Sequence, residues 1–202
     1  MTIRLVLADD QALVRGALAA LLDLESDLSV VGEAGSGAEV LEVVEATAPD
    51  VVLMDVEMPG LDGLEATAQL RERHPATRVL IVTTFGRPGD LRRALQAGAS
   101  GFVVKDTPAR GLADAVRRVH AGLRVVDPTL AADSLALGES PLAAREIAVL
   151  RAAAAGGSVA DIAKAVNLSE GTVRNHLSAV IGKTMARNRA DAVRIAQDSG
   201  WL

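Results

Sequence analysis

Short apolar runs rich in Val, Ile and Leu alternate with amphipathic stretches over about the first 120 residues. Each run is bounded by Gly, Pro, Asp or Thr, and the stretches between the runs have apolar positions at helical spacing. This alternation is typical of βα units in a parallel sheet with helices on both faces. The predicted strands are residues 3–8, 29–34, 51–54, 79–82 and 101–104. The predicted helices are residues 11–24, 37–47, 62–73, 89–97 and 108–121.

The pattern changes after Gly122, where Pro and Gly interrupt a stretch that has no strand signal. We therefore predict a linker over residues 123–140. From residue 142 onward the apolar positions have helical spacing throughout. The sequence thus predicts two domains, residues 1–122 and residues 141–202. The second is expected to be all-α, with four helices at residues 142–154, 159–166, 170–182 and 189–198.

The composition narrows the class of protein. Of the 202 residues, 50% are hydrophobic, which is enough for a buried core. The absence of cysteine excludes disulfides, thiolate metal sites and a cysteine nucleophile, and it suits a reducing compartment. No apolar run approaches the roughly 20 residues of a membrane span, and the N-terminus enters a strand-like run without a charged flank and cleavage site. We therefore expect a soluble, cytoplasmic protein that does not bind membranes.

Charge is divided unevenly between the two predicted domains. The whole chain has a formal net charge of −5, which on its own disfavours nucleic acid as a partner. Residues 1–138 have 13 Lys and Arg against 20 Asp and Glu, a net charge of −7, whereas residues 139–202 have eight against six, a net charge of +2. The acidity therefore belongs to the first domain. A charge of +2 is compatible with DNA binding but does not by itself indicate it.

Polar side chains follow four of the five predicted strands at the point where each strand ends. They are Asp9 and Asp10 after the first strand, Asp55 after the third, Thr83 and Thr84 after the fourth, and Lys105 after the fifth. Considered singly, such an Asp is usually a cap or turn residue and such a Lys is usually on the surface. In an open parallel sheet, however, the carboxyl ends of the strands line one crevice, which is where ligands bind. The sequence therefore predicts that these side chains converge on one site.

The residue types of this predicted site suit a metal ion and a phosphoryl group. Three carboxylates held together repel one another, so the cluster makes little sense without a cation. Hard oxygen ligands with room for water suit Mg²⁺, which would also attract a phosphate. Lys105 and the Thr83 hydroxyl can each bind a phosphoryl oxygen. Asp55 is then the natural nucleophile for in-line attack on phosphorus, which gives an acyl phosphate.

Residues 3 to about 121 resemble the receiver domains of two-component systems. The matching positions are Asp9-Asp10, Asp55, Met58-Pro59-Gly60, Asp62-Gly63, Thr83, the run from Ala97 to Phe102, and Lys105. The resemblance implies that a sensor histidine kinase transfers a phosphoryl group to Asp55 with Mg²⁺ bound. It also implies a switch in which Thr83 moves toward the phosphate and Phe102 turns inward. On residue type alone, Phe102 is equally well explained as the core residue of a strand.

The same resemblance implies a flavodoxin-like fold, a doubly wound five-stranded parallel sheet, and a role for each site residue. A phosphatase of the haloacid dehalogenase type also acylates an Asp, but it characteristically has a second Asp two residues later, where this chain has Glu57. We therefore expect no enzyme beyond a receiver that catalyses its own phosphorylation and dephosphorylation. The implied metal ligands are Asp9, Asp10, Asp55 and Glu57, and the implied phosphate-binding and switch residues are Thr83, Thr84, Lys105 and Phe102.

The third predicted helix of the second domain has the features of a DNA-recognition helix. Ser169 is placed to cap its N-terminus. The positions i, i+4, i+7 and i+8 form a buried face of Val173, Leu177, Val180 and Ile181. The opposite face is small and polar and has one charge, which suits a major groove where Arg reads guanine and Asn reads adenine, although such residues are also common on solvated helices. That face consists of Arg174, Asn175, Ser178 and Gly182, and it is followed by Lys183, Arg187 and Arg189 as predicted phosphate contacts.

Residues 142–198 resemble the NarL/FixJ (LuxR-type) helix-turn-helix domain. The matching positions are Arg145-Glu146, Val149-Leu150, Ile162-Ala163, Leu168-Ser169, Thr172 to His176, Lys183, Arg189 and Ala192-Val193. The resemblance implies a last helix that often contributes to a dimer. The implied DNA contacts are Ser169, Thr172, Arg174, Asn175, Ser178, Lys183 and Arg187.

A few positions refine this resemblance. Ala143 stands where a threonine cap is usual, with an expected cost of about 1 kcal/mol. Met185 stands where a small residue is common, so that we expect it to crowd the turn or to expose its side chain. Three short runs are similar to regulators of the desaturase-controlling type. They are Thr83-Thr84-Phe85, Arg87-Pro88-Gly89 and the ending Gly200-Trp201-Leu202.

Together these observations predict a transcription regulator controlled by phosphorylation. A sensor histidine kinase would phosphorylate Asp55, the first domain would switch, and a homodimer would bind a double-stranded operator with two half-sites. Pairing two weakly basic domains would raise their effective concentration on DNA. Two alternatives stay open. In one, binding needs no phosphorylation and the first domain is only a dimerisation scaffold; in the other, the output domain binds protein instead of DNA.

Overall fold

The computed structural model describes residues 2–84, 86–136 and 140–202. The chain forms two compact units, one comprising the residues up to 86 together with 91–131, and the other comprising 87–90 together with 132–202. Phe85 of the desaturase-type motif and residues 137–139 of the predicted linker lie outside the described residues. Among the helices of the described part, none is both long enough and apolar enough to cross a membrane.

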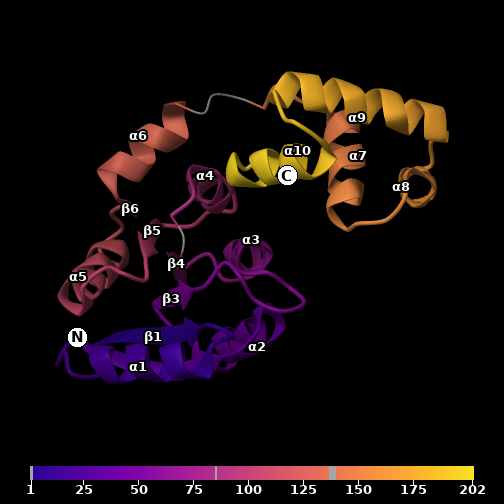
Figure 1. The fold of residues 1–202 in the computed structure, drawn as a ribbon. Coiled ribbons are helices and arrows are strands. Elements are labelled where there is room, and N and C mark those ends of the chain that lie inside the picture. The colour runs from indigo at the N-terminus through magenta and orange to yellow at the C-terminus, as the bar shows by residue number, and fades with distance from the viewer. Residues whose placement is uncertain (1, 85, 137–139) are drawn as a thin grey trace. The chain divides into compact units, whose positions relative to one another are not determined.

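The first unit contains a six-stranded parallel sheet with the strand order β2-β1-β3-β4-β5-β6 (Figure 1). Its strands are β1 (Ile3–Ala8), β2 (Leu28–Ala34), β3 (Val51–Met54), β4 (Arg78–Thr83), β5 (Gly101–Val104) and β6 (Val125–Val126). All five predicted strands form, and the predicted α/β fold with a parallel sheet is confirmed. The predicted number of strands is wrong by one, because β6 pairs with the open edge of β5. A strand of two residues is too short to show a periodicity in the sequence.

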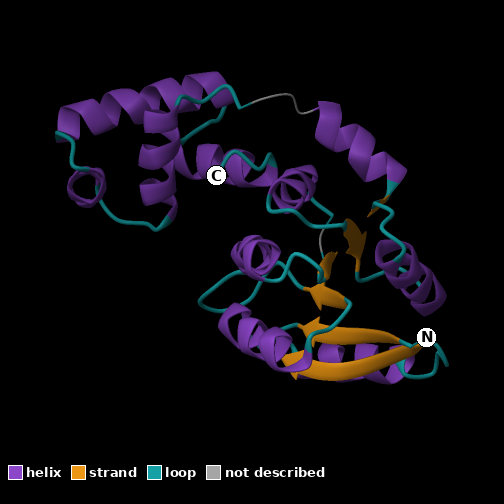
Figure 2. Ribbon diagram, turned by 180° about the vertical axis from the view of Figure 1, so that it is seen from behind, coloured by secondary structure: helices purple, strands orange, loops and turns teal. Residues whose placement is uncertain are grey.

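Helices cover both faces of this sheet (Figure 2). Buried side chains of α1 and α5, such as Leu22 and Val116, pack against one face. Those of α2, α3 and α4, such as Val40, Leu64 and Leu91, pack against the other. The helices up to residue 136 are α1 (Ala12–Leu22), α2 (Gly37–Thr47), α3 (Gly63–Arg73), α4 (Pro88–Gln96), α5 (Ala109–His120) and α6 (Pro128–Ala136).

The segment predicted as a linker, residues 123–140, contains both β6 and α6. Pro128 opens α6, a position where proline is favoured because its missing N–H would have no partner there. The Asp127 carboxylate caps this helix by accepting a hydrogen bond from Leu130 N at 3.0 Å. Pro128, which the sequence pattern marks as an interruption within a linker, therefore starts a helix. The predicted domain boundaries at residues 122 and 141 stay predictions.

The second unit contains the four predicted helices. They are α7 (Ala144–Ala154), α8 (Val159–Val166), α9 (Glu170–Thr184) and α10 (Arg189–Asp198). Ser158, Ser169 and Asn188 cap three of these helices, each by accepting a hydrogen bond from the backbone N–H three residues later. The buried face of α9 lies as predicted, except that Ile181 is only half-buried. The caps and the apolar spacing together account for the helix bounds.

Ala143 and Met185, which depart from the usual pattern of this domain, both lie at helix ends. Ala143 is the N-cap of α7 and has no side-chain oxygen, so only the reverse bond forms, from Ala143 N to Glu146 Oε2 at 2.7 Å. Met185 ends α9 in the left-handed conformation, at φ 52°, and its side chain is 90% exposed. Of the two consequences expected for Met185, exposure of an apolar side chain is therefore the one that occurs.

Candidate functional site

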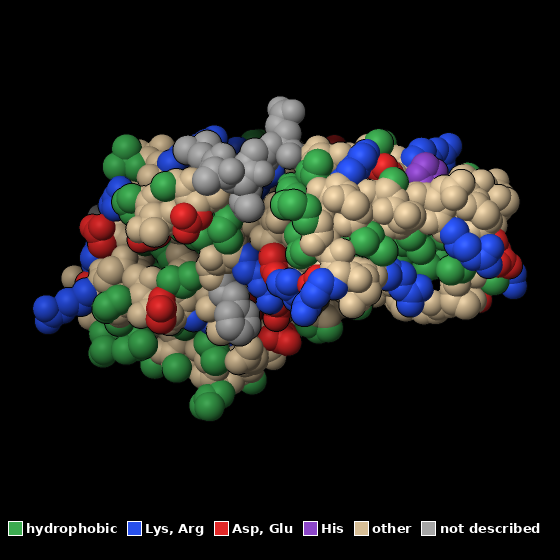
Figure 3. All heavy atoms as spheres, turned by 45° about the horizontal axis from the view of Figure 1, so that its top comes forward, with side chains coloured by type: hydrophobic (Ala, Val, Ile, Leu, Met, Phe, Trp, Pro, Cys, Tyr) green, Lys and Arg blue, Asp and Glu red, His purple; other side chains and the backbone are tan. Residues whose placement is uncertain are grey.

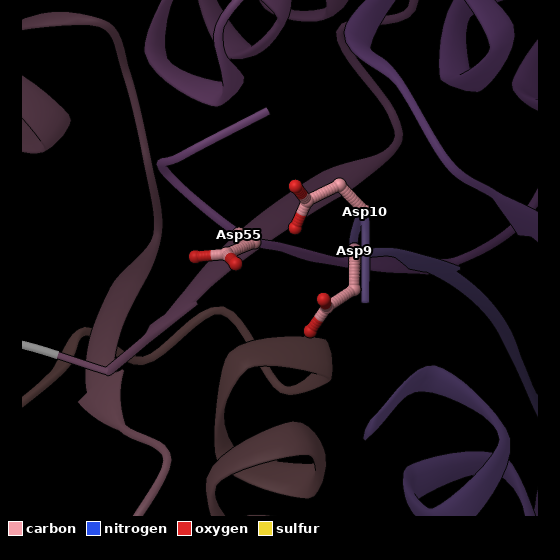
Figure 4. A group of neighbouring side chains, drawn as sticks. All are labelled: Asp9, Asp10 and Asp55. Carbon is pink, nitrogen blue, oxygen red and sulfur yellow. The ribbon is translucent and has the colours of Figure 1, made fainter. Parts of the chain in front are cut away.

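Three carboxylates lie together at the carboxyl ends of β1 and β3. These strands pair in register with Ala8 opposite Met54, so the residues that follow them, Asp9 and Asp55, emerge side by side. The ladder continues one step further, because Asp55 N donates to Ala8 O at 2.8 Å. Carboxylate oxygens of Asp9, Asp10 and Asp55 all lie within 4.8 Å of one another. Figure 4 shows the three side chains grouped at this end of the sheet.

Lys105, which follows β5, joins two of these carboxylates. Its Nζ donates to Asp55 Oδ2 at 2.7 Å and lies 2.7 Å from Asp9 Oδ2. Gln11 N and Val56 N donate to the Oδ1 atoms of Asp9 and Asp55. Asp9 Oδ2 is buried and accepts no hydrogen bond from the described residues, so its contact with Lys105 is an ion pair without hydrogen-bond geometry. This buried oxygen therefore has an ion-pair partner but no hydrogen-bond donor among the described residues.

Burial and charge shift the pKa values of this cluster. Burial raises the pKa of Asp55 more than the hydrogen bond and charge of Lys105 lower it, and the Asp9 carboxylate adds to the increase. Burial alone would lower the pKa of Lys105, but its contacts with Asp55 and Asp9 outweigh burial, so that this pKa is raised. Lys105 is therefore charged at neutral pH, and one ammonium group faces three carboxylates. The Asp9 oxygen that lacks a hydrogen-bond donor and the surplus of negative charge both fit a divalent cation that prefers oxygen ligands, such as Mg²⁺.

The other predicted residues of the site differ in their placement. Thr83, the last residue of β4, is buried, whereas Thr84 is exposed. Phe102 is fully buried in β5 and packs in the core on the same side of the sheet as α2, α3 and α4. Glu57 is exposed, and its carboxylate is not part of the acidic cluster. The structure thus brings together the aspartates and Lys105 but not the Glu57 side chain.

The Asp62-Gly63 pair, which matches the receiver domains, has a structural reason at the start of α3. A Cβ atom at Gly63 would lie 1.8 Å from the carbonyl oxygen of Asp55, which no side chain can tolerate. The start of α3 therefore packs directly on the backbone of the candidate phosphorylation site. Asp62 caps the same helix by accepting a hydrogen bond from Glu65 N at 2.8 Å.

Arg15 is a residue of this region that sequence reasoning missed. It lies in the second turn of α1, and its Nη1 donates to the carbonyl oxygen of Asp9 at 2.5 Å. Its Nε donates to Glu33 Oε2 at 2.9 Å, which ties the same side chain to β2. Arg15 thereby holds the backbone of the turn that carries the acidic pair. No residue type signals this contact in the sequence, because the acceptor is a main-chain oxygen that every residue has.

The exposed face of α9 carries most of the residues predicted to contact DNA. Thr172 is half-buried, and its hydroxyl lies 2.8 Å from that of Ser169. The remaining predicted contacts are exposed: Ser169, Arg174, Asn175, Ser178, Lys183 and Arg187. On the face of the molecule in Figure 3, Lys and Arg side chains are interspersed with acidic and uncharged ones. The predicted contact residues thus lie on one accessible helix face and the turn after it, but they form no dense basic patch.

Three of the four predicted DNA-contacting cations have a carboxylate partner within the second unit, whereas the fourth, Arg189, donates from Nη1 to Gly157 O at 3.0 Å. Arg174 Nη2 donates to Glu170 Oε2 at 2.6 Å, and Arg187 Nε donates to Asp191 Oδ2 at 3.2 Å. Lys183 Nζ donates to Glu146 Oε2 at 2.7 Å. The sequence did not predict these ion pairs. In two of these pairs the partners are four residues apart in sequence, whereas the third pair joins α9 to α7.

The Glu146–Lys183 pair is the one we expect to matter for stability, because Glu146 is buried. The hydrogen bond from Lys183 and the bond from Ala143 N hold the pKa of Glu146 below its usual range. A carboxylate whose pKa is lower in the folded than in the unfolded state stabilises the fold at pH values above the ordinary Glu pKa. This stabilisation is lost as the pH falls through the folded-state pKa. Lys183→Met is therefore expected to lower the free energy of unfolding at pH 7 by about 1 kcal/mol. Below about pH 4 the variant should lose less stability with falling pH than the wild type does.

Urea unfolding followed by the fluorescence of Trp201, the single Trp of the chain, measures this effect in the second unit. Lys164→Met, which removes an exposed Lys from α8, is the matched control and should leave the unfolding curve unchanged. Equal unfolding curves for Lys183→Met and the wild type at pH 7 would show that the pair contributes nothing.

The sequence matches two protein families. Residues 5–117 match the response regulator receiver domain, and residues 140–196 match the bacterial regulatory proteins of the luxR family. Together the two matches cover the sheet domain up to α5 and the four-helix domain. The acidic cluster and α9 each fall within a matched segment.

Similar proteins of known sequence and structure extend over the whole chain. The uncharacterized transcriptional regulatory protein YvfU of Bacillus subtilis is 44% identical over 200 residues, 99% of this chain and 100% of that protein. The transcriptional regulatory protein DesR of the same organism is 40% identical over 99% of each chain. The crystal structure of the response regulator ChrA of a heme-sensing two-component system is 34% identical and aligns over 100% of this chain and 99% of that chain, with a TM-score of 0.60.

Proposed function

Because the chain belongs to the two-component response regulators that have a LuxR-type DNA-binding domain, we propose that phosphorylation of Asp55 controls its binding to an operator. Members of this family are DNA-binding transcription regulators and not enzymes. The observation that carries the proposal is that Lys105 joins Asp9 and Asp55 beside the exposed Asp10. A site with this charge and these oxygens is suited to a divalent cation and a phosphoryl group.

The phosphoryl group would come from a phosphohistidine of a sensor histidine kinase. An oxygen of Asp55 attacks phosphorus, the P–N bond breaks, and the imidazole leaves with the electron pair and takes up a proton. The carboxylates of Asp9, Asp10 and Asp55 would hold Mg²⁺, which when bound neutralises charge on the phosphoryl oxygens. Glu57 stays a predicted ligand, with an exposed side chain outside the cluster.

The carboxyl ends of β4 and β5 would respond to the phosphate. Lys105 would exchange its bond with Asp55 for one with a phosphoryl oxygen. Thr83, whose carbonyl oxygen accepts from Lys105 N at 2.7 Å, and the neighbouring Thr84 would each offer a hydroxyl to another. Phe102 pairs with Ile81 in the β4–β5 ladder, two residues before Thr83. A shift of Thr83 toward the phosphate would therefore change the packing around the Phe102 ring, which is the switch that we propose.

In the second unit, α9 would lie in the major groove of the operator. Arg174 and Asn175 would contact base edges, whereas Lys183 and Arg187 would contact phosphates. Ser169, Thr172 and Ser178 are small hydroxyl residues on the same helix and would contact the backbone or bases at close range. A phosphate would then have to share or replace the carboxylate partners of Lys183 and Arg187.

A second copy of the chain would bind the exposed face of α1. This face is an uncharged stripe at helical spacing, and Leu13 at its start is 87% exposed. On α5, which contacts α1, the exposed Asp114 and Arg118 provide one charge of each sign beside the stripe. A twofold interface pairs each patch with its own copy, so an apolar stripe flanked by both charges is self-complementary. The exposed stripe consists of Leu13, Gly16, Ala17, Ala20 and Leu21.

Leu13→Glu is expected to abolish the dimer that forms on phosphorylation, because two carboxylates would be placed against each other in an apolar interface. Light scattering after size-exclusion chromatography measures the mass before and after treatment with acetyl phosphate and Mg²⁺. Ala46→Glu, an exposed change on α2, is the control and should leave the dimer intact. A Leu13→Glu chain that takes up phosphate and still dimerises would rule out this face.

Phosphorylation is expected to raise the affinity for DNA by about 10-fold or more, because a dimer binds with two domains at once. A short duplex selected from a random library with the phosphorylated full-length chain, called the selected duplex below, is the probe, and fluorescence anisotropy gives the affinity. Equal affinities for treated and untreated chain would favour the alternative in which the first domain is only a scaffold. Failure to select any duplex would favour a protein-binding output domain.

A further inference from the structure

A single acidic residue lies on the helix that we propose enters the major groove. The sequence of α9 contains one acid, Glu170, and two cations, Arg174 and Lys183. Lys183 is paired with Glu146 of α7, so its charge is already balanced. The exposed face of α9 is therefore nearly neutral, whereas surfaces that bind DNA are normally basic.

Glu170 contacts the residue that is predicted to read a base. Arg174 Nη2 donates to Glu170 Oε2 at 2.6 Å, one helical turn away. The two side chains are 62% and 49% exposed. An ion pair this exposed adds little to stability. An acid in the first turn of a helix is favoured by the helix dipole, but that preference does not require the contact with Arg174.

The guanidinium group can keep this partner while it reads a base. It has five N–H donors, and a bidentate contact with guanine uses two of them. A carboxylate that holds one donor restricts the rotamers of the Arg side chain. Arg174 is thereby partly oriented before DNA arrives, which reduces the entropy that it loses on binding.

We propose that Glu170 is a specificity-determining residue, which positions Arg174 and opposes its contacts with phosphates. The proposal rests on the proposed role of α9 in DNA binding. On every duplex, the Glu170 carboxylate is repelled by the phosphate backbone. This repulsion acts on all DNA alike, so the difference comes from Arg174, which Glu170 orients toward a base on the operator and withholds from phosphates on other sequences. Glu170 thus widens the difference in affinity between operator and other DNA.

The test compares Glu170→Gln and Glu170→Asp with the wild-type full-length chain, each treated with acetyl phosphate and Mg²⁺. The probes are the selected duplex and a scrambled duplex of the same composition. Glu170→Gln is expected to bind the scrambled duplex about fivefold more tightly and the selected duplex with a smaller gain, so that the ratio of the two affinities falls. Glu170→Asp keeps the charge but reaches less far, so it should bind the scrambled duplex weakly and also lose affinity for the selected one. An affinity ratio equal to that of the wild type in Glu170→Gln would overturn the proposal.

Two further variants separate this inference from its premise. Glu42→Gln removes the same charge from the exposed surface of α2, and it should leave the affinity ratio unchanged. If Glu42→Gln lowers the ratio as much as Glu170→Gln, the effect is one of net charge and the proposal is wrong. If Arg174→Ala leaves the ratio unchanged, the proposed DNA-reading role of α9 fails. If Arg174→Ala lowers the ratio and Glu170→Gln does not, only the role of Glu170 fails.

Discussion

Replacing Asp55 with Asn is expected to abolish the gain of roughly 80 Da in intact mass that the wild-type chain should show with acetyl phosphate and Mg²⁺. Asn has nearly the same shape as Asp, but its amide is not a nucleophile toward phosphorus. The loss of the adduct should therefore be complete. The change also removes the negative charge that holds the Lys105 ammonium group at 2.7 Å. Mass spectrometry of the intact chain measures the adduct directly, without knowledge of the kinase or the operator.

Two controls make this result specific to the acidic cluster. Asp133→Asn changes an exposed Asp on α6, outside both the acidic cluster and the proposed dimer face, and it should leave the adduct unchanged. Removal of divalent ions with EDTA should suppress the adduct in the wild type, because three carboxylates would then repel the incoming phosphate. An adduct that persists in Asp55→Asn would mean that another residue accepts the phosphoryl group.

Replacing Arg174 and Asn175 with Ala is expected to have the second large effect, on the preference for the selected duplex. A good bidentate contact with a base contributes about 1–3 kcal/mol of discrimination, so each single change should lower the ratio of selected to scrambled affinity by about 5- to 150-fold. The two residues are neighbours in sequence, so the double change need not equal the sum of the single ones. Fluorescence anisotropy over a series of salt concentrations gives both affinities and their salt dependence.

The salt dependence distinguishes base contacts from phosphate contacts. Loss of a base contact should weaken binding to the selected duplex while the slope against salt concentration changes little. Arg187→Ala, in contrast, should weaken binding to both duplexes and reduce that slope. Arg151→Ala, which removes an exposed Arg from α7, serves as the matched control. Equal affinity ratios for wild type, Arg174→Ala and Asn175→Ala would exclude the proposed reading of bases by α9.

Much of the fold and of the acidic cluster could be predicted because both follow from local patterns. Each buried strand is a continuous apolar run, and the carboxyl ends of parallel strands meet at one edge of the sheet. Asp9, Asp55 and Lys105 could therefore be placed together from their positions after three strands. The elements that were missed have no such pattern: β6 is two residues long, and α6 begins with a proline that also occurs in linkers.

The contacts that were missed depend on packing between distant segments. Arg15 binds a main-chain oxygen, and Glu146 and Lys183 are 37 positions apart. Neither contact can be inferred from spacing along one helix, because each needs the relative position of two packed elements. The sequence predicted which exposed residues of α9 would contact DNA, but not which acidic residues pair with them. A list of residue types on one face does not show which charges are already neutralised by other parts of the domain.

The pairing of β1 with β3 has a consequence for the motions of the site. Because Asp55 N donates to Ala8 O, the backbone of the proposed phosphate acceptor belongs to the β1–β3 ladder in the interior of the sheet. Amides in such ladders exchange with solvent only when large parts of a domain open. The acceptor is therefore as rigid as the centre of the sheet, while Asp10 and Thr84 at its rim are exposed to water. In the switch that we propose, the scaffold that holds Asp55 would therefore persist through both states, and the site would not have to form anew in each cycle.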